Sequence, residues 1–213
     1  MRYTDIVVGI DGSGTSRMAL RWAVAEARLR VAHLKILAAY SWTWPPDEFD
    51  DMIELPEYLG QRFEEMAAEA VAEARALEPG VEVTGGAVLG DPASALLEAG
   101  RTAAMVVVGN RGHGGFAGLL LGSVSQQVAT HAAGPVVVVR GRADAPPGPI
   151  MVGVDGSPSA QRALHFGFEE AQRRDCELVA VRSYPVPIPP RGGDVPPLLY
   201  DQDAAYVPGR QRP

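Results

Sequence analysis

The chain is predicted to form a doubly wound α/β domain with a five-stranded parallel sheet, followed by a partial second copy of that domain. Three observations predict this class. Short runs of apolar, β-branched residues alternate with longer stretches whose apolar residues recur at helical spacing. The runs are apolar throughout, which is typical of parallel strands covered by helices on both faces. Asp155-Gly156-Ser157 lies 144 residues after Asp11-Gly12-Ser13, which indicates an internal duplication.

Five strands and four helices are expected in the first copy. The strands are predicted at residues 6–10, 34–40, 81–89, 105–108 and 136–139. The helices are predicted after a cap at Ser13 and over residues 57–77, 92–103 and 123–132. Asp91 is expected to cap the third helix, with Pro92 at its first position. The stripe of the first helix that is predicted to face the sheet consists of Met18, Trp22, Ala25 and Leu29.

The repeat sets the expected domain boundaries. Residues 1–140 form the first domain, and residues 141–149 form a linker rich in glycine, proline and alanine. Residues 150–213 are expected to be a truncated second repeat, with a strand, a helix, a second strand and a proline-rich tail. At the offset of 144 residues, counterparts of Gly109 and Gly122 would lie beyond Pro213. The second repeat is therefore expected to lack the glycine-rich segment of the first.

Composition excludes several classes of function. A net charge of −7 and a single lysine, Lys35, leave no basic stripe for a nucleic-acid backbone. No apolar run approaches the roughly 20 residues that span a bilayer, and the amino terminus lacks the pattern of a signal peptide. Cys176 is the only cysteine, so no intrachain disulfide can form. We therefore expect a cytoplasmic protein that binds neither nucleic acid nor membrane.

The glycine-rich segment 109–125 has the features of a phosphate-binding loop. It contains Gly-x-x-Gly, nine further residues, and then Gly-Ser at the start of a predicted helix. Glycines let successive backbone N–H groups point into one anion-sized concavity. Those expected to do so are Gly109, Gly112, Gly114 and Gly115. The helix that starts at Gly122 adds free N–H groups and a positive dipole end, and the hydroxyls of Ser123 and Ser125 can donate to phosphate oxygens.

Two familiar phosphate loops do not fit the sequence. It contains no Gly-Lys-Ser/Thr of a Walker loop, and a dinucleotide-binding Gly-x-Gly-x-x-Gly would follow the first strand, whereas this segment follows the fourth. In open α/β sheets ligands lie beyond the carboxyl ends of the strands, which brings Asp11 to the same crevice. Asp11 is predicted to accept a ribose hydroxyl or to hold Mg²⁺, usually through water.

Simpler interpretations stay open at this point. The glycine-rich segment can be a flexible connection without a ligand. Asp11 can serve only its own turn, because Asp-Gly commonly starts a turn. Arg111 can be solvated, and Ser123 can be only a helix cap.

These residues resemble the universal stress protein family, whose ATP-binding members carry Gly-x-x-Gly-x9-Gly-Ser/Thr after the fourth strand and an aspartate after the first. The resemblance covers residues 3–140 and returns from 150 to about 184. It implies an adenine nucleotide alpha hydrolase-like sheet of strand order 3-2-1-4-5 and a site for ATP with Mg²⁺. The truncated second copy departs from the complete second copy of the family's tandem members, so one ATP per chain is expected, without a second nucleotide at Asp155. The nucleotide-binding residues that it implies are Asp11, Leu37, Ala39, Val108, Gly109, Arg111, Gly112, Gly122, Ser123, Val124 and Ser125.

The resemblance implies a stress-response module that regulates through its bound nucleotide. The sequence shows no nucleophile paired with a base, so at most weak catalysis is expected. One alternative is a slow ATP hydrolase or self-phosphorylating protein in which Ser123 or Ser125 accepts phosphate. Another is a partner-binding scaffold that needs no nucleotide. The strand at 136–139 would be an uncharged edge in the family's strand order, so a homodimer through residues 135–140 is expected.

Overall fold

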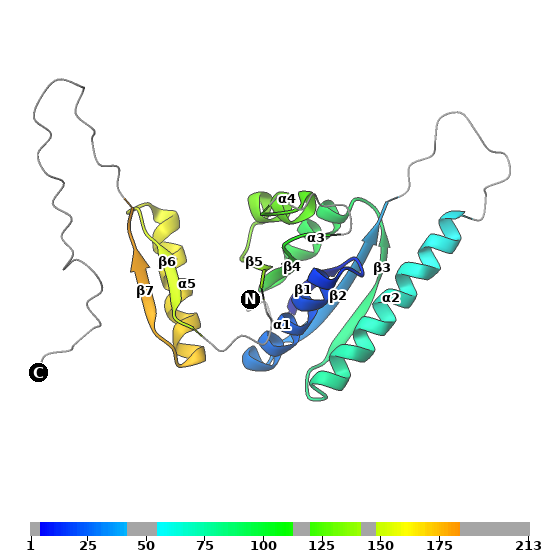
Figure 1. Cartoon of the computed structure of the whole chain (residues 1–213), viewed down its shortest axis with the longest axis horizontal. Coiled ribbons are helices and arrows are strands. Elements are labelled where there is room, and N and C mark those ends of the chain that lie inside the picture. The colour runs from blue at the N-terminus through cyan, green and yellow to red at the C-terminus, as the bar shows by residue number, and fades with distance from the viewer. Residues whose placement is uncertain (1–4, 42–54, 113–119, 142–147, 184–213) are drawn as a thin grey trace, which may run out of the picture. The chain divides into compact units, whose positions relative to one another are not determined.

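The computed structural model describes residues 5–41, 55–112, 120–141 and 148–183. The chain divides into two compact units, Met1–Pro146 and Pro147–Pro213 (Figure 1). Most of the predicted linker and the predicted proline-rich tail lie outside the described residues.

The first unit contains a five-stranded parallel sheet in the order β3-β2-β1-β4-β5, which confirms the predicted class and strand order. At its centre β1 pairs with β2 on one side and with β4 on the other, so that Val8 lies opposite both Ile36 and Val107. The carboxyl ends of β1 and β4 therefore lie side by side, where the strand order reverses. The strands are β1 (Asp5–Ile10), β2 (His33–Tyr40), β3 (Val83–Leu89), β4 (Met105–Gly109) and β5 (Val136–Val139).

Helices cover both faces of this sheet. Gly85 of β3 lies against Val71 of α2, whereas Leu37 of β2 belongs to a core cluster with Ala93 and Leu96 of α3. Because successive residues of a strand point to opposite faces, α2 and α3 lie on opposite sides. Helix α1 packs against α2, and α3 packs against α4. The helices of this unit are α1 (Gly14–Arg30), α2 (Leu55–Leu77), α3 (Pro92–Gly100) and α4 (Ser123–His131).

The prediction of which side of α1 faces the sheet is wrong. Leu29 and Ala25 are exposed, and Met18 and Trp22 are only half-buried. Three alanines at intervals of four residues lie on the buried side, and such small residues let a helix approach a sheet closely. The residues of α1 that are buried are Ser16, Ala19, Leu20, Ala23, Val24, Glu26 and Ala27.

Several element ends differ from the prediction for local reasons. Strand β3 begins two residues later than predicted, because the N–H of Val81 closes a turn onto the carbonyl of Glu78 at 3.1 Å. Helix α3 ends at Gly100 instead of residue 103. Its predicted cap is confirmed, since Asp91 accepts the N–H of Ser94 at 2.8 Å.

The second unit has a strand, a helix and a strand, namely β6 (Ile150–Gly153), α5 (Pro158–Arg174) and β7 (Leu178–Val181), with β6 and β7 parallel. Helix α5 packs closely on β6 at Gly167, where a Cβ would lie 2.4 Å from the Val152 side chain. Ser157 caps α5 by accepting the N–H of Ala160 at 3.1 Å. The second unit therefore repeats the β1-α1-β2 part of the first.

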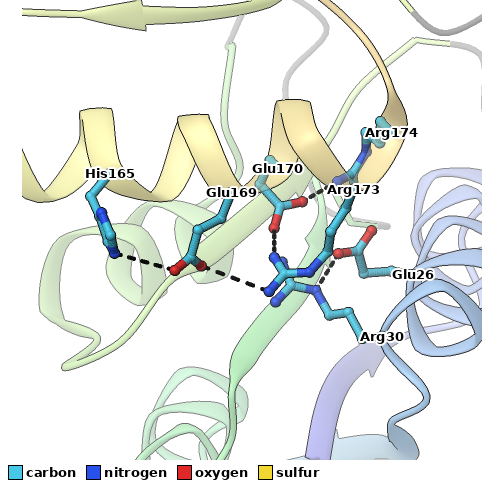
Figure 2. Close-up of polar contacts among 7 residues, drawn as sticks. All are labelled: Glu26, Arg30, His165, Glu169, Glu170, Arg173 and Arg174. Atoms are coloured by element: carbon cyan, nitrogen blue, oxygen red, sulfur yellow. Dashed lines mark hydrogen bonds and ion pairs between the residues drawn. The ribbon is translucent and has the colours of Figure 1, made fainter.

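The repeat also extends to charged side chains. Glu26 in α1 and Glu170 in α5 are both buried. Each forms an ion pair with the arginine four residues later, Arg30 and Arg174 respectively (Figure 2).

Candidate functional site

A cavity of about 540 Å³ lies at the carboxyl ends of β1 and β4. This is the position at which open α/β sheets bind ligands. All eleven residues that the family resemblance assigns to nucleotide binding line the cavity, although their contact with a ligand remains a prediction. They are Asp11, Leu37, Ala39, Val108, Gly109, Arg111, Gly112, Gly122, Ser123, Val124 and Ser125.

Asp11 follows β1 and forms a tight turn that starts α1. Its Oδ1 accepts the N–H of Ser13 at 3.0 Å, and the Ser13 hydroxyl accepts the N–H of Ser16 at 3.2 Å. Gly12 permits the turn with a φ of 84°, a conformation that favours glycine. One carboxylate oxygen of Asp11 therefore serves the turn.

The corresponding turn of the second unit has the same geometry. Asp155 Oδ1 accepts the N–H of Ser157 at 2.8 Å. Hydrogen bonds from the side chain and then the backbone of Ser157 hold the pKa of Asp155 below its ordinary value of 3.8. An aspartate at this position is thus explained by turn chemistry alone, and what distinguishes Asp11 is the loop that lies beside it.

The turn after β1 is in contact with the loop after β4. A Cβ on Gly112 would lie 2.4 Å from Asp11 Oδ2, and a Cβ on Gly109 would lie 2.8 Å from the backbone of Thr15. The hydroxyl of Thr15 donates to the carbonyl of Arg111. Glycine is therefore needed at position 109 for this close approach, and the second carboxylate oxygen of Asp11 lies against Gly112 of the glycine-rich loop.

The two described ends of the glycine-rich segment are held together. The N–H of Gly122 donates to the carbonyl of Asn110 at 2.8 Å, and the N–H of Asn110 donates to the carbonyl of Val139 at 3.1 Å. Gly122 is the N-cap of α4 and offers no side-chain acceptor, so the first N–H groups of α4 are left for another acceptor. Gly114 and Gly115, which the sequence assigns to the same concavity, lie outside the described residues.

Ser125 and Ser123 differ in their environments. Ser125 is buried, and its hydroxyl donates to the carbonyl of Gly109 at 2.6 Å. Because a serine hydroxyl has one hydrogen, that of Ser125 is used to fix α4 to the end of β4. Ser123 is exposed and lines the cavity. The sequence suggests both hydroxyls as phosphate donors, and the geometry favours Ser123.

The other part of the cavity wall is apolar. Leu37 and Ala39 of β2 and Val108 of β4 contribute to it. These side chains offer no hydrogen-bonding group. The cavity thus combines an apolar part with a part made of glycine backbone and the start of α4, an arrangement that suits a flat apolar ring joined to an anionic group.

The sequence model of the universal stress protein family matches residues 2–140 and 148–208. The chain belongs to the universal stress protein family. A universal stress protein of Mycobacterium tuberculosis is 35% identical over 197 residues, which cover 84% of this chain and 62% of that relative. One of Mycolicibacterium smegmatis is 35% identical over 200 residues, which cover 91% of this chain and 66% of that relative.

Solved structures of universal stress proteins have the same fold. One from Archaeoglobus fulgidus superposes with a TM-score of 0.69 at 20% identity, covering 87% of this chain and 69% of that chain. UspA from Lactobacillus plantarum superposes with a TM-score of 0.51 at 23% identity, covering 66% of this chain and 99% of that chain. The present chain spans 62% to 66% of the length of the two curated relatives.

Five residues of the cavity wall were not expected from the sequence. Pro92 and Leu96 belong to α3, which the strand order of the universal stress protein family places over the central strands. The close approach of α3 is possible because β1 carries Gly9, where a Cβ would lie 2.9 Å from Leu96. The strand order combined with the predicted start of α3 at Pro92 was the signal that could have identified these two residues. The full set is Gly9, Ile10, Ser16, Pro92 and Leu96.

Charged groups are few in this universal stress protein site. Among the described residues that line the cavity, Asp11 is the only acidic one and Arg111 the only basic one. Within the described part of the chain, no three His, Cys, Asp or Glu side chains gather as a metal site would require. Nor does any helix described here combine the length and apolar character needed to cross a bilayer.

Proposed function

We propose that this chain binds ATP in the cavity, one nucleotide per chain, and acts as a cytoplasmic stress-response module that regulates through the bound nucleotide. The observation that supports this most is the meeting of two features at one cavity. The start of α4 has no side-chain acceptor for its first N–H groups, and the Gly109–Gly112 backbone lies beside it. Together they offer an electropositive cradle for phosphate.

The apolar part of the cavity supports an adenine base as the other end of the ligand. Leu37, Ala39 and Val108 form a wall that a flat ring can contact. Aromatic and apolar contacts provide most of the burial of such a ligand, and a few polar groups fix its orientation. The guanidinium of Arg111 would then add a planar, always charged donor for phosphate oxygens.

Magnesium would accompany ATP at Asp11. Mg²⁺ keeps several waters and is commonly held by one or two carboxylates together with substrate phosphates. A single carboxylate whose Oδ2 lies against the Gly112 backbone fits that donor set. Asp11 would hold the ion through water, and the ion would supply neutralisation of phosphate charge.

Replacement of Gly122 by valine tests the assigned loop. A Cβ at Gly122 would lie 3.4 Å from Arg111 Cα and 3.6 Å from the Gly112 nitrogen, so a branched side chain would fill the space between the loop backbone and α4. Calorimetry with ATP should show binding by the wild type and none by Gly122→Val. ADP, AMP and cyclic AMP as competitors report which phosphates contribute.

Gly134→Val is the matched control, because a Cβ there meets nothing within 4 Å. It should bind ATP like the wild type. Unchanged affinity in Gly122→Val would contradict the assigned loop.

Self-phosphorylation is the second candidate, and the exposed Ser123 hydroxyl favours it. In that reaction Ser123 Oγ attacks the γ-phosphorus, the bond to the bridging oxygen breaks, ADP leaves and the hydroxyl proton passes to solvent. Intact-mass measurement after incubation with Mg-ATP should show a phosphate adduct that is absent from Ser123→Ala. A single unmodified mass in the wild type excludes it.

We also propose that the chain forms a homodimer through β5. Three of its four valines are half-buried, and the strand carries no charge. Uncharged edge strands are normally paired or covered.

A further inference from the structure

Thr15, in the first turn of α1, contacts the loop after β4 at two points. Its backbone lies against Gly109, where a Cβ would lie 2.8 Å from the carbonyl carbon and oxygen of Thr15. Its hydroxyl donates to the carbonyl of Arg111. Thr15 is half-buried and is not among the described residues that line the cavity. Any effect of its side chain on a ligand in the cavity must therefore pass through the loop.

The direction of the hydrogen bonds around Thr15 follows from the hydrogens that are available. Ser13 Oγ lies 3.1 Å from Thr15 Oγ1. A hydroxyl has one hydrogen, and because that of Thr15 goes to the carbonyl of Arg111, Ser13 is the donor to Thr15. Ser13 Oγ in turn accepts the N–H of Ser16 at 3.2 Å. A continuous chain of hydrogen bonds thus runs from the backbone of α1 to the backbone of the loop, and the bonds of such a chain strengthen one another.

The bond from Thr15 fixes a peptide plane of the loop. The carbonyl of Arg111 and the N–H of Gly112 belong to one peptide group, which is trans, and in a trans peptide these two groups point in opposite directions. A carbonyl that is held toward the first turn of α1 therefore turns the Gly112 N–H away from that turn. The Gly112 nitrogen lies 3.6 Å from the place where Gly122 would carry a Cβ, so it lies beside the start of α4.

The second unit shows that the start of the helix does not require this contact. Ser157 caps α5 as Ser13 caps α1. The counterpart of Thr15 is Ser159, which is exposed and accepts a hydrogen bond from Arg162 of its own helix at 3.0 Å. The cap is thus common to both units, whereas the hydrogen bond from this position to a glycine-rich loop is described in the first unit alone.

We propose that Thr15 is a positioning residue for the phosphate-binding loop. Its hydroxyl holds the Gly112 N–H in the orientation that receives a phosphate oxygen, and thereby raises the affinity for the phosphates of the nucleotide without contacting them. This inference rests on the proposed ATP site. Because the chain of hydrogen bonds ends at the glycine backbone and not at the apolar wall of Leu37 and Ala39, loss of the hydroxyl should weaken binding of the phosphates and leave binding of the base unchanged.

Calorimetry with ATP and with adenosine tests this difference. Thr15→Val keeps the branched shape of the side chain and removes the hydroxyl. It should weaken ATP binding at least about tenfold, the factor that one hydrogen bond to a charged group contributes. Its affinity for adenosine, which has no phosphate, should equal that of the wild type, and Thr15→Ser, which keeps the hydroxyl, should bind both ligands like the wild type. Unchanged ATP affinity in Thr15→Val, or an equal loss of affinity for both ligands, overturns the proposal.

Thr130→Val is the matched control. The hydroxyl of Thr130 also donates to a backbone carbonyl, that of Gln126 at 2.7 Å, but it lies in the last turn of α4. Thr130→Val should bind ATP like the wild type, and a loss as large as that in Thr15→Val would contradict a specific role of Thr15. Thr15→Ala removes the same hydroxyl with a smaller side chain and replaces Thr15→Val in these comparisons if the valine prevents folding.

Nuclear magnetic resonance of the chain without nucleotide tests the peptide plane directly. The amide order parameter of Gly112 should be lower in Thr15→Val than in the wild type, and unchanged in Thr15→Ser and Thr130→Val. An equally ordered Gly112 amide in Thr15→Val overturns the proposal whether or not ATP binds. If the wild type does not bind ATP although the Gly112 amide becomes less ordered in Thr15→Val, the proposed ATP site fails and the positioning of Gly112 by Thr15 stands.

Discussion

At the residue scale, the position that constrains the site most is Gly109, because its Cβ would meet backbone and not a movable side chain. That Cβ would lie 2.8 Å from the carbonyl carbon and oxygen of Thr15. Gly109→Ala should therefore destabilise the first unit by about 1–3 kcal/mol, the usual cost of overpacking. Urea unfolding measures this.

Gly14→Ala is the control for Gly109→Ala. A Cβ at Gly14 meets nothing within 4 Å, and alanine favours the helix that begins there. Gly14→Ala should be neutral or slightly stabilising. Equal destabilisation by the two changes would show that the contact between the two loops is not what requires glycine.

Val31 is a second residue at which the backbone conformation determines how a substitution affects stability. It ends α1 in the left-handed conformation, with a φ of 52°, and is 92% exposed. A left-handed conformation costs an L-residue about 1–2 kcal/mol, less for asparagine and aspartate. Val31→Asn should therefore raise the midpoint of thermal unfolding, since the valine side chain contributes little burial.

The repeat provides the reciprocal experiment for Val31. Its counterpart Asp175 has a φ of 50°. Asp175→Val should lower the stability of the second unit by a similar amount. A stabilising effect of Asp175→Val would contradict the strain argument.

At the element scale, α1 and α2 are joined by Glu73, which accepts hydrogen bonds from Arg17 at 2.8 Å and Arg21 at 3.2 Å. Burial on its own raises the pKa of Glu73, but the hydrogen bonds and charges of the two arginines outweigh it, so the pKa lies below its ordinary value of 4.5. A lowered carboxyl pKa contributes stability that is complete above the unfolded-state value and is lost as the pH falls through the folded-state value.

Glu73→Gln should thus cost about 0.2–1 kcal/mol at pH 7, the range for solvent-accessible ion pairs. The difference in the free energy of unfolding between Glu73→Gln and the wild type should vanish as the pH falls below about 4.5, the ordinary pKa of the carboxyl. Glu69→Gln is the control, because Glu69 is an exposed glutamate on the same helix, one turn before Glu73. A Glu73 effect that is independent of pH would show that packing, and not charge, joins the helices.

The α1 helix also shows where sequence periodicity fails. The expected stripe was centred on Trp22, the bulkiest residue, whereas the buried side contains Ala19, Ala23 and Ala27. The periodicity of apolar residues indicates that a helix has an apolar side, but in α1 apolar residues lie around much of the helix circumference. Which side faces the sheet depends on how closely the two surfaces must approach, and small residues are favoured where that distance is short.

At the scale of the whole molecule, the sheet itself was predictable because fully apolar runs and the glycine spacing are local properties. The resemblance added the strand order. The role of the Ser125 hydroxyl was not predictable, because its acceptor is the carbonyl of Gly109, sixteen residues away. The contribution of Leu96 to the cavity could be inferred only by combining the strand order with the predicted start of α3, since α3 lies over strands that are distant from it in sequence.

The β5 interface is tested by the mass of the full chain. The chain should have the mass of a dimer at micromolar concentration, because the uncharged edge strand β5 is expected to pair with its counterpart in a second copy. Light scattering measures this. A strictly monomeric mass would contradict pairing through β5 and would leave the nucleotide site unaffected.

The hydrogen bond between Gly122 and Asn110 has a consequence for engineering. It joins the end of β4 to the start of α4 through backbone groups alone. Side-chain substitutions that leave the fold intact therefore keep this bond, whereas proline at position 122, which has no N–H, would remove it.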